Sequence, residues 1–512
     1  MKNTEQQRNW ISRMRLRAAS AVLVAAAVPM LAVVTAQSAQ GQTFTTLYSF
    51  DGTDGYAPQA SLVQATNGNL YGTTQVGGAN EDCTFYAVTT GCGTVFTITP
   101  SGTLTSLYSF CAQPGCTDGE TPTGALIQAT NGDLYGTSGG GASGYGTVYR
   151  ITLSGTLTTL HSFDSTDGSY PSAGLVQDTN GDFYGVTSYG GAYGQGTVFK
   201  ITPSGALTTL YSFCSQSGCP DGSGPVGPLV QAANGSFYGA TVFGGNSTAC
   251  TSGCGTVIKI TTGGALTTLH SFEYTDGKNP NVGLIQATNG DFYGTTFYGG
   301  AYNSPYGYGT VFKITPSGTL TTLVSFDDTD GIWPTAGLVQ GTDGNLYGET
   351  QLGGINGVGG TIFKMTPSGT LTTLYNFCSQ SDCKDGYGPL AAPTQDTNGT
   401  FYGTTWLGGA SSTCEGCVSG GGNGTVFSLS VGLRQFVETQ TTSGKVGAAV
   451  KILGTNLTGA TSVTFNGTAA TFTVVSKSEI STTVPEGATT GTVEVTTRRG
   501  TLKSNTKFRV TP

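Results

Sequence analysis

A sevenfold internal repeat constrains this chain more than any other feature. The dipeptide Tyr-Gly, preceded by Leu or Phe, recurs with its tyrosine at positions 71, 135, 184, 238, 293, 347 and 402. Successive tyrosines are 64, 49, 54, 55, 54 and 55 residues apart. Seven units therefore fill the chain from Thr43 to about Gly432, which is typical of a repeat architecture.

Each unit contains four short runs in which apolar residues alternate with Thr or Lys, the period of a β-strand. Asn289-Gly290 separates the first two runs of the unit around Tyr293 and predicts a type I′ hairpin, in which both central residues need positive φ. Four antiparallel strands in each of seven units predict a β-propeller. In this unit the runs are residues 283–288, 291–296, 310–315 and 319–326.

The two ends of the repeat region complement each other. Residues 43–50 form a fourth run with no third run before it, and residues 424–430 form a third run with no fourth run after it. Pairing the two would close the ring and cover open sheet edges. The expected fold is therefore all-β: a seven-bladed propeller over 43–432, with four-stranded blades and closure by its N- and C-terminal strands.

The repeat also resembles a known family. It reads Gly-Thr-Val-Phe-x-Ile-Thr-Pro-Ser-Gly-x-Leu-Thr-Thr-Leu-Tyr-Ser-Phe, then Asp-Gly-x-x-Pro, then Leu-Val-Gln-x-x-Asn-Gly-x-Phe-Tyr-Gly. This pattern is similar to the GloVer (Gloeo/Verruco) tandem repeat and covers all seven units. The resemblance implies export and display at the bacterial cell surface, and it supplies no catalytic residue.

The last segment, 433–512, does not follow the repeat pattern. Short strand-like runs such as Val463-Thr-Phe-Asn-Gly-Thr alternate with turn residues and predict a small immunoglobulin-like β-sandwich. The segment resembles a TIG/IPT domain, although Gln435-Phe-Val-Glu-Thr stands where the family's first strand usually has Pro-x-Ile. The resemblance implies a spacer or an interaction module.

The first 36 residues predict a cleaved signal peptide, with cleavage as late as 39. Four arginines precede an apolar run from Ala18 to Val34, and small residues follow near Ala36 and Ala39. The alternative is a membrane anchor, but the run is shorter than the roughly 20 residues of a spanning helix. We therefore expect a secreted or surface-displayed protein with no membrane span after cleavage.

Cysteine spacing fits the same compartment. Twelve cysteines form six close pairs, and an even count in an exported chain predicts disulfides that staple local loops. Zinc is the alternative at Cys414-x-x-Cys417, but a second half-site with that spacing is missing. The pairs are Cys83/Cys92, Cys111/Cys116, Cys214/Cys219, Cys250/Cys254, Cys378/Cys383 and Cys414/Cys417.

Every unit carries Asp-Gly-x-x-Pro after its fourth run. The motif predicts a turn, because Asp accepts backbone N–H groups, Gly takes positive φ and Pro fixes the next residue. Calcium is the alternative, since some units add an upstream acid and calcium prefers several oxygen ligands. The candidate calcium ligands are Asp51, Asp54, Asp164, Asp167, Glu273, Asp276, Asp327 and Asp330.

Charge and histidine content restrict function. The propeller region carries 7 Lys/Arg and 24 Asp/Glu, a net charge of −17, and should repel nucleic acid. Segment 433–512 carries 9 and 4, a net charge of +5. The two histidines, His161 and His270, occupy an outer-strand slot that is usually Tyr, and we interpret them as packing variants. No histidine remains for a catalytic triad or a metal site.

Ligand candidates are the aromatic residues at variable loop positions, because aromatic rings with a polar tip suit sugar or protein contacts. The leading hypothesis is an exported cell-envelope binding or adhesion protein with a glycan or protein ligand. The alternatives are an extracellular polysaccharide hydrolase or lyase, in which no particular carboxylate pair is marked, and a purely structural surface protein. The candidate ligand-binding residues are Tyr56, Tyr170, Trp333, Tyr387, Tyr189, Tyr298, Tyr302 and Trp406.

Overall fold

The computed structural model describes residues 41–80, 83–85, 88–281, 283–302, 306–410 and 422–511. The described part begins at Gly41 and forms one compact unit. The predicted signal peptide and the predicted pair Cys414/Cys417 lie outside the described residues.

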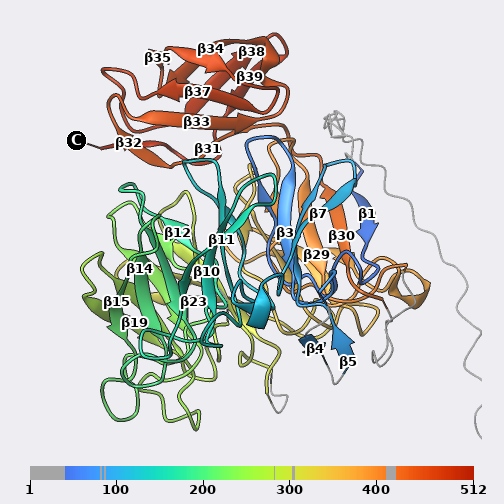
Figure 1. The fold of residues 1–512 in the computed structure, drawn as a ribbon, viewed down its shortest axis with the longest axis vertical. Coiled ribbons are helices and arrows are strands. Elements are labelled where there is room, and N and C mark those ends of the chain that lie inside the picture. Colours follow the sequence, from blue (N-terminus) through green and yellow to red (C-terminus); the bar gives the residue numbers. More distant parts are fainter. Residues whose placement is uncertain are drawn as a thin grey trace, which may run out of the picture. The chain divides into compact units, whose positions relative to one another are not determined.

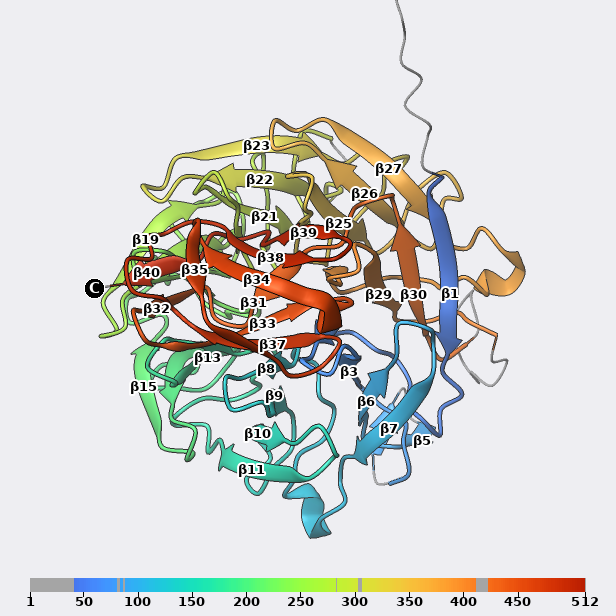
Figure 2. The same cartoon turned by 90° about the horizontal axis from the view of Figure 1, so that it is seen from above.

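Seven four-stranded antiparallel sheets surround a central axis, each running from a short strand near the axis to a longer one at the rim (Figure 2). The first strands, nearest the axis, are β2 (Val63–Gln64), β8 (Ile127–Gln128), β12 (Val176–Gln177), β16 (Val230–Gln231), β20 (Ile285–Gln286), β24 (Val339–Gln340) and β28 (Thr394–Gln395). The second strands are β3 (Leu70–Thr74), β9 (Leu134–Ser138), β13 (Phe183–Thr187), β17 (Phe237–Thr241), β21 (Phe292–Thr296), β25 (Leu346–Thr350) and β29 (Phe401–Thr405).

The two outer strands of each blade complete the predicted seven-bladed propeller. The third strands are β6 (Thr94–Ile98), β10 (Thr147–Ile151), β14 (Thr197–Ile201), β18 (Thr256–Ile260), β22 (Thr310–Ile314), β26 (Thr361–Met365) and β30 (Thr425–Ser430). The fourth strands, at the rim, are β7 (Leu104–Ser109), β11 (Leu157–Ser162), β15 (Leu207–Ser212), β19 (Leu266–Ser271), β23 (Leu320–Ser325), β27 (Leu371–Asn376) and β1 (Thr43–Ser49). A hairpin, β4 (Cys83–Phe85) and β5 (Val88–Thr90), and two 3₁₀ turns, η1 (Pro114–Cys116) and η2 (Ser381–Cys383), lie in the connections.

Closure of the ring follows the prediction. Strand β1, the first of the described chain, pairs antiparallel with β30, and the seventh blade has the order β1-β30-β29-β28. Phe44 of β1 stacks on Tyr375 of the preceding blade with ring centroids 3.7 Å apart. The seventh blade is thus built from both ends of the propeller sequence.

The predicted type I′ turn is wrong. Positive φ falls on Gly290 (90°) and not on Asn289, and the Gly290 N–H donates to Ala287 O at 2.8 Å. This is a three-residue loop, in which a type I turn is followed by one left-handed residue. Asn289 instead donates from Nδ2 to the Tyr293 hydroxyl at 2.9 Å and accepts the Asp291 N–H at 3.0 Å.

The repeated Tyr of the second strand packs between blades. Tyr184 lies against Phe237 of the next blade with centroids 4.2 Å apart, and Tyr238 lies against Phe292 at 4.1 Å. The following Gly leaves room for a ring of its own blade: a Cβ on Gly185 would lie 2.5 Å from Phe199 Cζ. The Tyr-Gly motif therefore encodes contact between blades and contact within a blade.

In five blades a glutamine at the end of the first strand accepts a backbone N–H of a neighbouring blade. The Gln128 side-chain carbonyl accepts the Thr66 N–H at 2.9 Å, and Gln177 accepts the Thr130 N–H at 3.0 Å. Gln64 does the same across the closure, accepting the Thr397 N–H at 3.0 Å. Each bond satisfies a backbone donor that the short inner strand leaves unpaired.

Beyond β30 the chain forms a small two-layer β-domain (Figure 1), which matches the predicted immunoglobulin-like sandwich. One sheet contains β31 (Val437–Thr439), β33 (Ala449–Gly454), β37 (Glu479–Thr483) and β36 (Phe472–Val474). The other contains β35 (Thr468–Ala470), β34 (Ala460–Phe465), β38 (Val493–Thr497) and β39 (Gly500–Lys503), with η3 (Leu457–Gly459) before it. A parallel pair, β32 (Ser443–Lys445) and β40 (Arg509–Thr511), completes it.

This C-terminal domain packs on the end of the propeller that carries the Asn-Gly hairpins, which we call the hairpin face. Ser478 donates to Thr66 O at 2.7 Å, and the Gln440 side chain donates to Ala129 O at 2.7 Å. Further bonds reach three more blades: Asn505 donates to Gln340 O at 3.0 Å, Thr455 bonds Thr397 at 3.0 Å and Arg509 contacts Ala233 O. The opposite end, which we call the loop face, carries no contact from this domain in the hydrogen bonds of the described residues.

Candidate functional site

Two sets of loops meet on the loop face. The Asp-Gly-x-x-Pro loops enter each blade, and the loops after Gly-Gly join its second and third strands. Isolated antiparallel bridges tie them together in the described blades, for example Ser169 to Tyr189 and Lys278 to Tyr298. Side chains from both sets therefore contribute to one surface.

In six of the seven blades the aspartate of the Asp-Gly-x-x-Pro loop is held by a side chain of the outer strand beside it. Tyr108 donates its hydroxyl to Asp118 at 2.7 Å, and Tyr211 donates to Asp221 at 2.8 Å. In two blades histidine replaces the tyrosine and keeps the contact: His161 Nε2 lies 2.7 Å from Asp167 Oδ2. The histidines lie in the predicted outer-strand slot, but they carry a hydrogen bond to the loop that the packing interpretation missed.

The predicted calcium ligands take part in hydrogen-bonded turns. Asp51 Oδ1 accepts the Thr53 N–H at 2.9 Å and the Thr53 hydroxyl at 2.7 Å, while Asp54 Oδ1 accepts the Asp51 N–H at 3.0 Å. The hydrogen bond from the Thr53 hydroxyl is the main cause that lowers the pKa of Asp51, and the bond from the Thr53 N–H adds to it. The same pattern recurs at Asp164/Asp167 and Asp327/Asp330, and Glu273 donates its N–H to Asp276. Calcium at these loops stays a prediction, tested by titrating the folded protein with the ion.

Three of the loops use a disulfide where the others use an upstream acid. Cys111–Cys116, Cys214–Cys219 and Cys378–Cys383 are bonded, as are Cys83–Cys92 and Cys250–Cys254 elsewhere on the ring. In two of these loops the aspartate is buried, with Asp118 3% exposed and Asp385 fully buried, whereas Asp221 of the third loop is half-buried. The disulfide and the acid are alternative ways of holding one loop shape.

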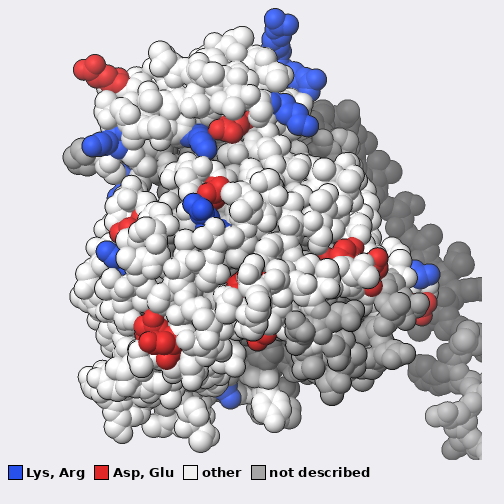
Figure 3. Space-filling model, in the orientation of Figure 1, with Lys and Arg blue, Asp and Glu red and all other residues white. Residues whose placement is uncertain are grey.

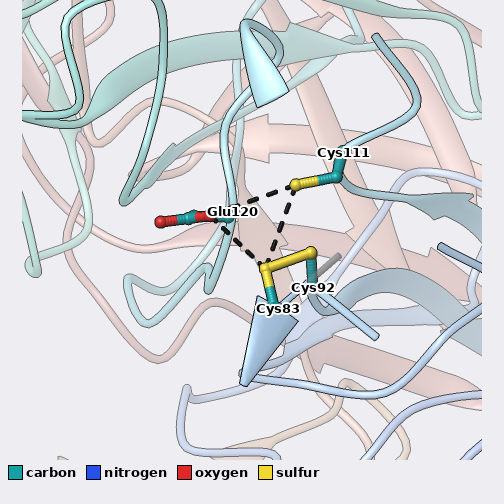
Figure 4. A group of neighbouring side chains, drawn as sticks. All are labelled: Cys83, Cys92, Cys111 and Glu120. Carbon is teal, nitrogen blue, oxygen red and sulfur yellow. Dashed lines mark hydrogen bonds between the residues drawn. A yellow bond between two sulfur atoms is a disulfide. The ribbon is translucent and has the colours of Figure 1, made fainter. Parts of the chain in front are cut away.

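One sulfur cluster combines two of these disulfides with a carboxylate (Figure 4). Cys83 Sγ lies 3.9 Å from Cys111 Sγ and 3.3 Å from Glu120 Oε2. A metal ion needs several ligand atoms close together. Among the described residues, this cluster is the one in which at least three Cys, His, Asp or Glu ligand atoms lie within 4.8 Å of one another. Both cysteines are oxidised here, so neither supplies the thiolate that a metal ion would need.

One blade lacks the outer-strand donor. Val324 stands where other blades have Tyr or His, and burial raises the pKa of its aspartate, Asp330, to about 6. Because the folded-state pKa lies above the unfolded value of about 3.9, this group costs stability as pH rises through 4 to 6.

We expect Val324→Tyr to restore the hydroxyl donor and to raise the stability above pH 6 by about 0.5–1.5 kcal/mol. Denaturant unfolding at pH 4 and pH 7 would measure the change. Val324→Phe is the matched control, since it adds the ring without the hydroxyl. Equal stabilisation by both variants would contradict the hydrogen-bond explanation.

The structure places the predicted ligand-binding aromatics on the loop face with unequal exposure. Tyr170, Tyr189 and Tyr302 are 59%, 56% and 46% exposed, whereas Tyr56, Tyr298, Trp333, Tyr387 and Trp406 are half-buried. Tyr170 and Tyr189 meet edge to face with centroids 5.8 Å apart. Trp333 stacks on Phe297 at 5.4 Å and meets Tyr298 at 6.1 Å.

Two of these aromatics stand on left-handed backbone. The residue before the loop proline has positive φ in all seven blades, and in two blades it is Gly224 or Gly388, each at 63°. Tyr170 has φ 56° and Trp333 has φ 57° at the same position. Left-handed backbone costs a bulky residue roughly 1–2 kcal/mol, and such strain gathers at functional positions. Alternation of Gly with large residues before Pro is the sequence signal that would have revealed this position.

Family models match a segment of the propeller and most of the C-terminal domain. Residues 218–418 match the Gloeobacter/Verrucomicrobia repeat, and residues 436–510 match the IPT/TIG domain. No curated protein shows a significant match to the sequence.

Similar solved structures are distant. A luciferin-regenerating enzyme is 10% identical and aligns over 77% of this chain and 98% of its own, with a TM-score of 0.39. A putative gluconolactonase is 10% identical over 77% and 94%, with a TM-score of 0.35. A protein of unknown function from Bacteroides thetaiotaomicron is 12% identical over 76% and 94%, with a TM-score of 0.36. None of these likenesses carries an argument about activity.

Proposed function

We propose that this chain, which carries Gloeobacter/Verrucomicrobia repeats followed by a TIG domain, is an exported surface protein that binds a neutral glycan on its loop face. Tyr170 and Trp333 carry the proposal. Each occupies a left-handed position where glycine suffices in other blades, and each presents its ring among other aromatics. We infer that the rings are retained for contact with a ligand.

The arrangement of the two ends supports this choice of surface. The C-terminal domain contacts the hairpin face, so the loop face is free of it. The propeller is acidic, with a net charge of −17, and would repel an anionic ligand. A neutral sugar that stacks on tyrosine and tryptophan rings is not repelled by this charge, and on the loop face the C-terminal domain does not block it.

Several features support the proposed location. Disulfides persist in oxidising compartments, and five lie within the described residues. The repeat and the TIG domain fit a surface or extracellular protein. Within the described ranges, the structure contains no helix of the length and apolar character needed to cross a bilayer.

The test uses glycine substitutions, because glycine already occupies this position in two blades. We expect Tyr170→Gly with Trp333→Gly to weaken glycan binding at least tenfold, since each aromatic contact contributes about 0.5–1.5 kcal/mol beyond the area that it buries. The same variant should lose little stability, because glycine relieves the backbone strain. A neutral-glycan array followed by calorimetry, with and without calcium, measures the binding and the role of the ion.

Ala57→Gly is the matched control. Ala57 has φ 56° at the equivalent position of another blade and carries no ring. It should relieve strain and leave binding unchanged. Unchanged binding by the Tyr170/Trp333 variant, or no binding of the native protein to any neutral glycan, would remove the proposal.

A further inference from the structure

A second surface lies between the C-terminal domain and the hairpin face. Two hollows of about 510 and 660 Å³ adjoin there, and they share the chain segment 433–435 and Thr501. Both volumes are within the range of small-molecule sites, about 300–1,000 Å³. The hollows lie at the opposite end of the propeller from the loop face, so a ligand here would not compete with one there.

The smaller hollow is lined by two guanidinium groups from separate segments. Arg434 lies in the link between β30 and β31, and Arg499 lies in the turn between β38 and β39. Both side chains are exposed, and neither forms an ion pair among the described residues. No described lining residue of this hollow is acidic.

Arg434 lines both hollows, but the other charged residues around the larger one are paired. Asp343 lies 2.8 Å from Lys364, and Lys503 lies 2.8 Å from Glu494. Two unpaired arginines, Arg434 and Arg499, come together only in the lining of the smaller hollow. Figure 3 shows Lys and Arg side chains gathered on the C-terminal domain, in agreement with its net charge of +5.

The remaining walls of the smaller hollow are polar. Gln435 and Asn456 add side-chain amides for which the structure shows no hydrogen bond within the described part of the chain. Asn398 of the seventh blade closes the propeller side, held by bonds to Tyr402 and Thr400. The site offers paired charged donors with neutral amides beside them, and among its described lining residues it has no aromatic ring.

We propose that this hollow binds an oxyanion-bearing saccharide, with a carboxylate or sulfate group between Arg434 and Arg499. Guanidinium groups match the two oxygens of such groups with parallel hydrogen bonds. The amides of Gln435 and Asn456 serve the hydroxyls of the sugar ring. A long polyanion is disfavoured, because the acidic propeller adjoins the site on one side.

The mature protein would be titrated by calorimetry with trigalacturonate, which carries carboxylates, and with a chondroitin sulfate disaccharide, which adds sulfate. Galactobiose is the neutral probe. We expect at least one anionic probe to bind, binding to weaken when NaCl is raised from 50 to 500 mM, and Arg434→Gln with Arg499→Gln to weaken it at least tenfold. If both anionic probes bind, the site recognises an oxyanion in general. If only one binds, the result shows whether the site prefers the carboxylates of trigalacturonate or the sulfated disaccharide.

Lys507→Gln is the matched control, since it removes one exposed positive charge from the same domain outside both hollows. It should change the affinity less than twofold. The proposal is overturned if neither anionic probe binds, if galactobiose binds equally well, or if Lys507→Gln has the same effect as the arginine variant. The Tyr170/Trp333 variant should bind the anionic probes normally, so this proposal and the proposed loop-face function can fail separately.

Discussion

Removing residues 41–49, and with them strand β1, is expected to prevent stable folding of the propeller. The seventh blade would lose its outer strand, its pairing with β30 and the stacking of Phe44 on Tyr375. Phe50, which follows β1, is fully buried and would lose its anchor. Burying one large apolar side chain contributes about 1.5–3 kcal/mol. The free energy of unfolding of a typical domain is only about 5–15 kcal/mol, so losing several such contacts together removes a large part of it.

The deletion variant should aggregate or form mixed oligomers, because β30 becomes an open edge that can pair with another chain. Size-exclusion chromatography and thermal unfolding would measure this. A synthetic peptide covering residues 42–50 should restore the monomer, whereas a scrambled peptide of the same composition should not. A monomeric deletion variant with native thermal stability would contradict closure of the ring by β1.

Replacing Glu349 by glutamine is expected to stabilise the protein at neutral and alkaline pH. Glu349 is fully buried in β25, and neither of its side-chain oxygens has a hydrogen-bond partner. Burial raises the pKa of this carboxyl well above its ordinary value. A raised folded-state pKa means that the folded protein holds a proton that the unfolded chain releases, so stability falls as pH rises from about 4.3.

The gain from Glu349→Gln should be small at pH 4 and should grow towards pH 8, because only the native protein must keep a buried carboxyl protonated as the pH rises. Denaturant unfolding at pH 4, 6 and 8 provides the comparison. Glu486→Gln is the control, since Glu486 is exposed in the C-terminal domain and should leave the profile unchanged. If the Glu349→Gln variant is no more stable than the native protein at pH 8, Glu349 is not a destabilising buried carboxyl.

Glu349 also illustrates how far one repeat departs from the others. In six blades a leucine covers the glycine of the second strand: a Cβ on Gly348 would lie 2.7 Å from Leu338 Cδ2. In the seventh blade Pro393 replaces that leucine, and Glu349 Oε1 reaches from the neighbouring blade to 3.1 Å from the equivalent Cβ on Gly403. Glu349 therefore lies beside Gly403, the glycine that a leucine covers in the other six blades.

The sequence by itself determined the number of blades, the strand count of each blade and the closure of the ring. These properties follow from local patterns: strand alternation, Tyr-Gly spacing and two incomplete repeats at the ends. Five of the predicted disulfides also follow from spacing alone, since a cysteine four to nine residues from its partner meets it across a short loop.

Only the tertiary structure decided which loops carry strain, which acids lack partners and where the C-terminal domain sits. Left-handed φ at Tyr170 accompanies a hydrogen bond from its N–H to Tyr145 O of the preceding blade, a contact between residues far apart in the loops. The turn at Asn289 differed from its prediction because the asparagine side chain bonds Tyr293 and its own turn. The hollow beside Arg434 and Arg499 is formed where the C-terminal domain meets the propeller. In the sequence, each of these arginines looks like an ordinary exposed charge.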